Sequence, residues 1–149
     1  MTEELAPIRL SIETAATPEA AWEALTDPAR IAEWFTDAAD LGNVGDAYRL
    51  DFGDGTVVEG IVTERDDGRR FGYTWAWAGD EPRAETVVRW TVEPLAGGRS
   101  RVSLEHSGWT AAGLDQATRT DHAGYWQGYL QDLAEVLGED GSAGAPGAG

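Results

Sequence analysis

The chain has 149 residues, 27 of them acidic and 11 basic, which gives a formal net charge of −16 and suits a single domain. This charge repels nucleic-acid phosphates and anionic lipids, so we expect neither nucleic acid nor a membrane as a partner. The chain contains no cysteine, which excludes disulfides and thiolate chemistry and is compatible with a reducing compartment.

Every basic residue is an arginine. The acidic excess either keeps the protein in solution or reflects adaptation to high salt, because carboxylate-rich surfaces are one halophilic device. The N-terminal residues show no signal peptide, and no apolar run approaches the roughly 20 residues of a membrane span. We therefore expect a cytoplasmic protein.

Near the N-terminus the pattern predicts one strand followed by two short helices. Residues 8–13 alternate between apolar and polar side chains, which is typical of a strand with one buried face. Thr17-Pro18 and Asp27-Pro28 each predict a helix start, because threonine and aspartate are good N-caps and proline suits the first helical position. The second helix should extend to about Phe35.

From Gly45 to His106 the pattern predicts five more strands. Apolar and polar residues alternate within short segments, and turn signals rich in glycine and aspartate separate these segments. Successive hairpins of this kind give an antiparallel meander. The expected strands cover residues 47–52, 56–64, 71–77, 86–92 and 102–106.

The last predicted element is a helix from about Thr118 to Leu137, in which apolar residues recur at spacings of three and four. Gly138 is a candidate for its C-cap. Residues 139–149 are mostly glycine, alanine and serine, cannot bury apolar surface, and should be disordered. We therefore expect one domain, residues 1–138, followed by a disordered tail.

This order of elements resembles the helix-grip fold of the START and birch-pollen-allergen superfamily, also called SRPBCC. Three stretches narrow the resemblance to the family named after activators of the heat-shock protein 90 ATPase, and the match runs from about Ile8 to Leu137. The stretches are Ala21-Trp22 through Asp27-Pro28 to Trp34-Phe35, then Phe71 to Trp75, and then Leu104 to Trp109 with His122, Gly124 to Trp126 and Leu130 to Leu137.

The resemblance implies an α+β fold. It would contain a curved antiparallel sheet of about six strands, two short helices after the first strand, and a long C-terminal helix on the concave face. Stand-alone relatives are usually supposed to hold small hydrophobic molecules in a cavity between sheet and helix. The expected function is therefore binding of a small, mostly apolar molecule that is lipid-like, aromatic or polyketide-like.

The seven tryptophans are the most informative feature of the composition. In this fold the sheet and the long helix cannot close on each other fully, so inward aromatic rings either line a cavity or simply fill the core. Core packing is favoured for Trp22 and Trp34 in the short helices. The candidate cavity residues are Trp34, Tyr48, Tyr73, Trp75, Trp77, Trp90, His106, Trp109, His122, Trp126 and Tyr129.

His106 and His122 are the only histidines, and both should point inward. Together they could polarise a carbonyl or act as general acid and base, although a single inward histidine is more often a hydrogen-bonded structural group. No metal site is expected, since strand alternation directs Glu105 away from His106. No further catalytic constellation is recognisable, and no cofactor is expected.

Two other functions stay open. The chain also resembles polyketide cyclases and aromatase-like enzymes, which would use His106 or His122 together with a tyrosine. Alternatively, it is a chaperone co-factor or a regulatory module, whose acidic surface would steer association with a protein partner that the sequence does not identify.

Overall fold

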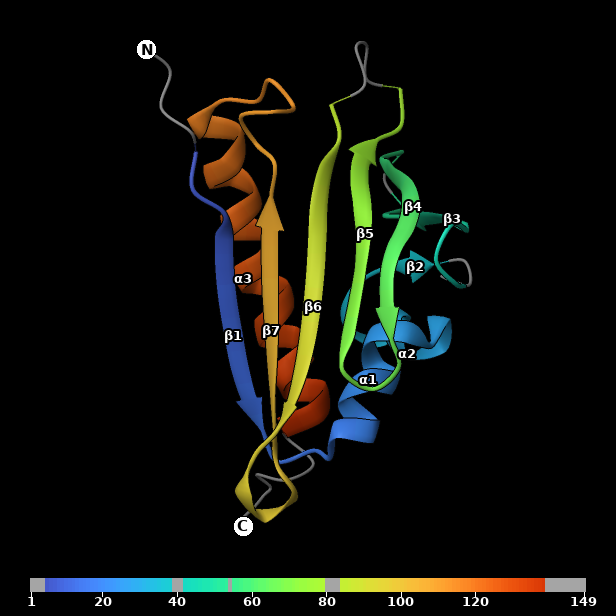
Figure 1. Cartoon of the computed structure of the whole chain (residues 1–149), viewed down its shortest axis with the longest axis vertical. Coiled ribbons are helices and arrows are strands. Elements are labelled where there is room, and N and C mark those ends of the chain that lie inside the picture. Colours follow the sequence, from blue (N-terminus) through green and yellow to red (C-terminus); the bar gives the residue numbers. More distant parts are fainter. Residues whose placement is uncertain (1–4, 39–41, 54, 80–83, 139–149) are drawn as a thin grey trace.

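The computed structural model describes residues 5–38, 42–53, 55–79 and 84–138. Within these residues the chain runs from an N-terminal strand to a long closing helix (Figure 1). In chain order the elements are β1 (Ile8–Thr14), α1 (Pro18–Thr26), α2 (Pro28–Trp34), β2 (Asp37–Ala38), β3 (Ala47–Asp51), β4 (Val57–Asp66), β5 (Arg70–Trp77), β6 (Thr86–Pro94), the 3-10 turn η1 (Ala96–Gly98), β7 (Ser100–Ser107) and α3 (Gln116–Gly138).

The strands form one antiparallel sheet in the order β1-β7-β6-β5-β4-β3-β2, so the first strand lies beside the last. The predicted α+β helix-grip architecture is thereby confirmed. Six strands of the described chain have five or more residues, and β2 adds a seventh strand of two residues. The sequence did not predict β2, because two residues are too few to show an alternation.

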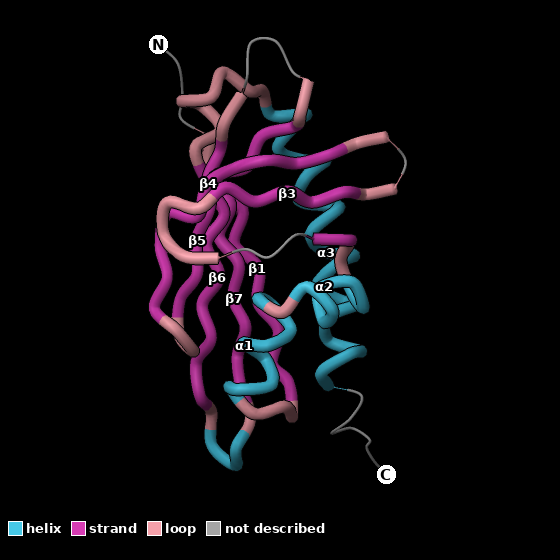
Figure 2. Tube along the Cα trace, turned by 90° about the vertical axis from the view of Figure 1, so that its right-hand side faces the viewer, coloured by secondary structure: helices cyan, strands magenta, loops and turns pink. Residues whose placement is uncertain are grey.

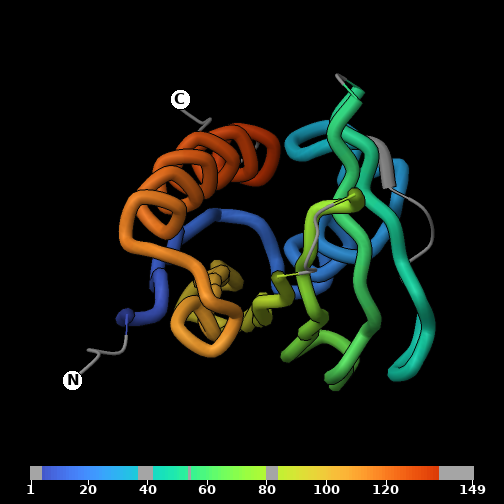
Figure 3. Tube along the Cα trace, turned by 90° about the horizontal axis from the view of Figure 1, so that it is seen from above, coloured from blue at the N-terminus to red at the C-terminus, as the bar shows by residue number. Residues whose placement is uncertain are grey.

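All three α-helices lie on one side of the sheet (Figure 2). Seen from above, the sheet is curved and α3 lies over one side of it, in contact with β1, α1 and α2 (Figure 3). The pairing of β4 with β5 shifts register between Val62 and Glu64. An irregularity of this kind bends a strand and increases its twist, and it therefore contributes to the curvature that leaves room between the sheet and α3.

The starts of α1 and α2 agree with the prediction. The Thr17 side chain accepts a hydrogen bond from the N–H of Ala20 at 3.2 Å, and the Asp27 carboxylate accepts one from the N–H of Ala29 at 3.0 Å. Each bond satisfies a backbone donor that the first helical turn leaves free. The two caps follow each other closely, so the chain crosses one end of the sheet as two short helices.

The long helix α3 begins at Gln116, two residues before the predicted start. The Asp115 carboxylate accepts hydrogen bonds from the N–H and the hydroxyl of Thr118, at 2.9 and 2.8 Å, and thereby caps the helix. These bonds lower the pKa of the Asp115 carboxyl below its ordinary value. The predicted tail, residues 139–149, lies outside the described residues. The buried stripe of α3 consists of His122, Trp126, Leu130, Leu133 and Leu137.

A row of ion pairs crosses the outer face of the sheet. Arg9 contacts Glu105 at 2.9 Å, and Glu105 also contacts Arg89 at 3.5 Å. Arg89 then reaches Glu64 at 2.8 Å. The backbone register places Gly72 between Arg89 and Glu64, and because glycine has no side chain, the arginine can cross β5 above it.

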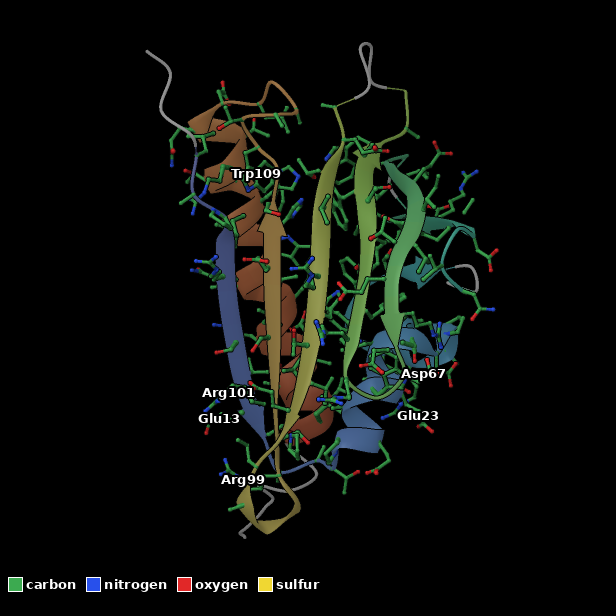
Figure 4. The ribbon with its side chains drawn as sticks, viewed as in Figure 1. Glu13, Glu23, Asp67, Arg99, Arg101 and Trp109 are labelled. Atoms are coloured by element: carbon green, nitrogen blue, oxygen red, sulfur yellow. The ribbon has the colours of Figure 1, made fainter. Side chains whose placement is uncertain are left out.

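A second group of charges lies at the end of β1 and β7, where Glu13 is close to two arginines (Figure 4). Glu13 contacts Arg101 at 2.9 Å and Arg99 at 3.7 Å, and the hydrogen bond from Arg101 lowers the pKa of the Glu13 carboxyl. Because solvent screens exposed pairs of this kind, they contribute little to stability. Their main effect is to hold the charged side chains on the outer face.

Gly60 in β4 allows a tyrosine to reach across the strand. The Tyr48 side chain extends from β3 over Gly60, and its hydroxyl donates a hydrogen bond to the carbonyl of Thr74 in β5. A Cβ atom at position 60 would lie 2.1 Å from the Thr74 carbonyl oxygen and 2.7 Å from the Tyr48 ring. Position 60 therefore has no room for any side chain.

We expect Gly60→Ala to lower the free energy of unfolding by about 3 kcal/mol, because the added methyl group overlaps backbone atoms that cannot move independently. Gly124→Ala is the matched control. It makes the same change on the exposed side of α3, where a Cβ meets nothing within 4 Å, and should raise the free energy of unfolding by about 0.5–1 kcal/mol. Urea unfolding followed by circular dichroism measures both, and equal effects would contradict the packing described for Gly60.

Candidate functional site

A cavity of about 480 Å³ lies between the sheet and the middle of α3. Its volume is within the range of pockets that bind small molecules. Four segments form its wall: the end of β5, the middle of α3, the residues after α2, and the turn between β3 and β4. The lining residues are Phe35, Thr36, Phe52, Thr56, Trp75, Trp77, His122, Tyr125, Trp126 and Tyr129.

Phe35 brings three of these segments together. It caps the C-terminal end of α2, where its backbone N–H bonds to the carbonyl of Ile31. Its ring lies 4.7 Å from the Tyr129 ring and 5.4 Å from the Trp126 ring, measured between centroids. The same ring is nearly parallel to that of Trp75 at 6.3 Å. Rings from α2, β5 and α3 therefore meet around Phe35 at the edge of the cavity.

The wall of the cavity is aromatic and uncharged. Seven of its ten lining residues are phenylalanine, tyrosine or tryptophan, and no aspartate, glutamate or arginine of the described chain is among them. The polar groups on the wall are hydroxyls, indole N–H groups and one imidazole. Such a surface offers large, flat contact areas and a few hydrogen-bonding positions, and it has no charge to pair with a charged ligand.

His106 is completely buried behind Trp75, with 5.5 Å between the ring centroids. Its Nδ1 accepts a hydrogen bond from the indole Nε1–H of Trp126 at 2.9 Å. Because an indole nitrogen can only donate, Nδ1 carries no proton and the neutral ring is protonated on Nε2. That Nε2–H donates to the hydroxyl of Thr86 at 2.7 Å, and the hydroxyl donates to the Trp75 carbonyl at 3.3 Å.

These bonds leave no place for a second proton on His106. A protonated Nδ1 would direct its N–H at the N–H of Trp126. Burial lowers the pKa of His106 well below its ordinary value, and the neighbouring His122 lowers it further. His106 is therefore a neutral group that links β6, β7 and α3, and it does not line the cavity.

His122 is on the cavity wall and has the opposite tautomer. Its Nδ1 is 2.8 Å from the backbone carbonyl of Thr118, which can only accept, so Nδ1 carries the proton. Its Nε2 accepts a hydrogen bond from the Nε1–H of Trp77 at 3.2 Å. Burial lowers the pKa of His122, and the bond to Thr118 and the charge of Asp121 partly oppose this effect. The cavity wall thus presents an imidazole whose outer nitrogen is an acceptor.

The indole of Trp75 differs from the other inward indoles. Its N–H is buried and has no hydrogen-bond partner in the described part of the chain. An unsatisfied buried donor costs about 1–3 kcal/mol, and native proteins usually satisfy such groups with protein, water or a ligand. The indoles that donate to protein acceptors are those of Trp34, Trp77, Trp90, Trp109 and Trp126.

The structure divides the eleven candidate cavity residues into two groups. Trp75, Trp77, His122, Trp126 and Tyr129 lie on the wall of the cavity. The other six are buried in the core and do not line this cavity: Trp34, Tyr48, Tyr73, Trp90, His106 and Trp109.

Hydrogen bonds within the protein explain why several of the second group belong to the core. Trp90 donates to the Tyr73 hydroxyl at 3.0 Å, and burial raises the pKa of that hydroxyl. Trp34 donates to the carbonyl of Ala24 at 2.8 Å, which agrees with the core packing favoured for it. Trp109 donates to the backbone carbonyl of His106 at 2.9 Å, and its ring covers the imidazole. Their polar atoms are thus satisfied without a ligand.

Five wall residues were not predicted: Phe35, Thr36, Phe52, Thr56 and Tyr125. Tyr125 is exposed and follows His122 by three positions, so helical spacing could have indicated it. Phe35 and Phe52 each end a predicted element, where alternation and helical spacing no longer apply. The two threonines gave no signal, because only the fold brings the segments after α2 and before β4 to the same space.

Within the described residues, no group of three or more histidine, aspartate or glutamate side chains is arranged to hold a metal ion. No helix in this part of the chain is both long enough and apolar enough to cross a membrane.

Residues 15–138 match the family model described as "Activator of Hsp90 ATPase homolog 1-like protein". Among curated proteins, none matches the sequence significantly. The same fold is found in DynU16, a protein of the dynemicin biosynthetic locus, with a TM-score of 0.78 and 25% identity. That match covers 88% of this chain and 46% of DynU16, so this chain spans less than half of that protein.

Two further solved structures match over nearly their whole length. The AHSA1 protein from Silicibacter pomeroyi has a TM-score of 0.71 and 27% identity, over 88% of this chain and 96% of that one. The Aha1 dimer from Colwellia psychrerythraea has a TM-score of 0.74 and 23% identity, over 89% of this chain and 96% of that one. At this identity the second match shows the shared fold alone.

The two histidines predict how stability depends on pH. In the folded protein the pKa of each is lowered, whereas in the unfolded chain it returns to about 6.5. The unfolded state therefore binds more protons below pH 6.5, and the free energy of unfolding, complete above that value, falls as pH decreases. Between pH 7 and 5 we expect a loss of about 2 kcal/mol, mainly from His106.

Urea midpoints measured between pH 7.5 and 5 test this expectation. The lowered pKa values of Glu13 and Asp115 affect stability only at more acidic pH. The change in the free energy of unfolding between pH 7.5 and 5 therefore comes from the histidines. Replacing both histidines with glutamine should flatten the profile. A free energy of unfolding that stays constant from pH 7 to 5 in the native protein would contradict the neutral, buried state of His106.

Thr86 provides a second test of the histidine network. Thr86→Val keeps the side-chain shape but leaves the Nε2–H of His106 without an acceptor, so it should cost about 1–3 kcal/mol of unfolding free energy. Thr86→Ser retains the hydroxyl and should cost less. Thermal unfolding of the two variants compares them directly, and an equal loss in both would show that the hydroxyl is not what matters.

Proposed function

This chain belongs to the activator of Hsp90 ATPase homolog 1-like family, and we propose that it binds a small, mostly apolar molecule in the cavity between its sheet and α3. The observation that carries the proposal is the cavity itself, a half-open space of about 480 Å³ with a wall that is largely aromatic. Small-molecule sites are typically concave spaces of this kind, which bury most of the ligand against apolar and aromatic side chains.

The chemistry of the wall favours a flat, uncharged ligand over a charged one. Aromatic side chains contact planar molecules over large areas, and His122 is held in its neutral form. An aromatic or polyketide-like molecule therefore suits the cavity better than a lipid with a charged head group. DynU16, which belongs to a biosynthetic locus, has the same fold, and a small-molecule ligand is consistent with that setting.

The unpartnered indole N–H of Trp75 gives independent support. The residue lines the cavity, and its buried donor lacks an acceptor in the described chain. A small rotation of the indole toward the cavity would bring this donor to an oxygen atom of a ligand and relieve the resulting cost. We also propose a cytoplasmic setting, with which the absence of cysteine is compatible.

An enzymatic use of the same cavity, as in the cyclase-like alternative, would rest on His122. Its Nε2 is unprotonated and belongs to a wall residue, so it could act as a general base once the hydrogen bond from Trp77 opens. His106 is bonded within the core and does not line the cavity, so it is the weaker candidate.

Binding of the neutral fluorescent probe N-phenyl-1-naphthylamine tests the proposal. We expect saturable binding with increased probe fluorescence. Thr56→Phe should weaken this binding at least about tenfold, because the new ring occupies space in the cavity. Thr63→Phe is the matched control: it adds the same ring at an exposed position of β4 that does not line the cavity. Equal binding by the native protein and the Thr56→Phe variant would place the probe elsewhere and refute the proposal.

A further inference from the structure

Trp77 and His122 form a polar pair on the cavity wall. The Nε1–H of Trp77, from the end of β5, donates to the Nε2 of His122, from α3, at 3.2 Å, which is the long end of the usual range. Both rings belong to the wall, so this bond borders the space available to a ligand. We propose that the pair recognises a hydroxyl group of the ligand by opening to admit its oxygen between Trp77 Nε1 and His122 Nε2. This inference rests on the proposed function.

The fixed tautomer of His122 determines what the pair can recognise. The Thr118 carbonyl keeps the proton on Nδ1, so Nε2 offers a lone pair. The Trp77 indole offers an N–H and cannot accept. One donor and one acceptor, supplied by two different elements, therefore face the same point.

A hydroxyl group is the small group that satisfies both partners. Its oxygen accepts from Trp77 while its hydrogen donates to His122, so two hydrogen bonds replace one. An ether or ketone oxygen accepts from Trp77 but leaves His122 Nε2 unpaired, at the cost of an unsatisfied buried acceptor. A carboxylate places negative charge against that lone pair, in a cavity whose described wall contains no arginine.

The position of Trp77 in the sheet allows the pair to open. The pairing of β5 with β6 ends at Trp75, whereas Trp77 is paired on its other side with Val58 of β4. Trp77 is also only half-buried, while His122 is buried and anchored to Thr118. The indole is therefore the partner that moves, and the imidazole is the fixed acceptor.

Isothermal titration calorimetry with 2-naphthol and 2-methoxynaphthalene at pH 7.5 tests the inference. The two probes share one ring system and differ in the ability of their oxygen to donate. A merely apolar cavity would favour the ether, because its extra methyl group adds buried area. We expect the native protein to bind 2-naphthol about three- to tenfold more tightly than the ether, as one additional hydrogen bond implies.

Two variants identify His122 as the acceptor. His122→Phe keeps an aromatic ring but removes the lone pair, and the preference for 2-naphthol should disappear, with the ether bound equally well or more tightly. His122→Gln supplies an amide oxygen and should retain part of the preference. Circular dichroism establishes that both variants are folded, and the ratio in the native protein tests the inference without them.

The outcomes separate this inference from the proposed function. If neither probe binds, the proposed function fails and the inference with it. If both probes bind and the affinity for the ether equals or exceeds that for 2-naphthol, the cavity binds ligands but does not recognise a hydroxyl group. That result overturns the inference. A preference that persists unchanged in His122→Phe also overturns it, because the acceptor must then be another group.

Discussion

The hydrogen bond from the Trp126 indole to Nδ1 of His106 fixes where α3 lies over the sheet. It connects the middle of the long helix to β7, and the Thr86 hydroxyl holds the other side of the imidazole from β6. Because the bond exists only while Nδ1 is unprotonated, the attachment of α3 depends on a histidine that burial keeps neutral. His122 and Tyr129 lie one turn before and almost one turn after Trp126, so this bond also contributes to their positions on the cavity wall.

The shapes of the side chains explain why a space remains beside this anchor. Around Phe35, Trp75 and Trp126 the rings meet with centroids 5.2–6.3 Å apart and at angles from 16° to 52°. Flat, rigid rings that meet at such different angles leave part of the space between the curved sheet and α3 unfilled. Aromatic side chains also have few rotamers with which to adapt to that space. The last turns of α3 carry leucines instead, and these are fully buried. The same helix thus closes the core at one end and borders a cavity in its middle.

Charge is separated from this interior by the alternation of the strands. Arg9, Arg89 and Glu105 point to the outer face, where they pair with one another and with Glu64. The inward positions of the same strands carry uncharged side chains, mostly apolar ones, together with the neutral His106. As a result, a protein with a net charge of −16 encloses a cavity wall without a charged side chain in its described residues. A ligand would be selected there by shape and by single hydrogen bonds.

Local sequence determined the elements of this protein. Alternation predicted the six longer strands, and the caps at Thr17 and Asp27 predicted two helix starts, because these signals depend on neighbours within a few residues. The tertiary structure decided the rest. The two-residue β2, the cavity wall at Phe35 and Thr56, and the tautomer of His106 all depend on partners far away in the sequence, whereas Thr118, four residues before His122, fixes the tautomer of that histidine. Periodicity showed which aromatic rings face inward. Only the packing of α3 on the curved sheet determines which of these rings line the cavity, because residues from several segments together form its wall.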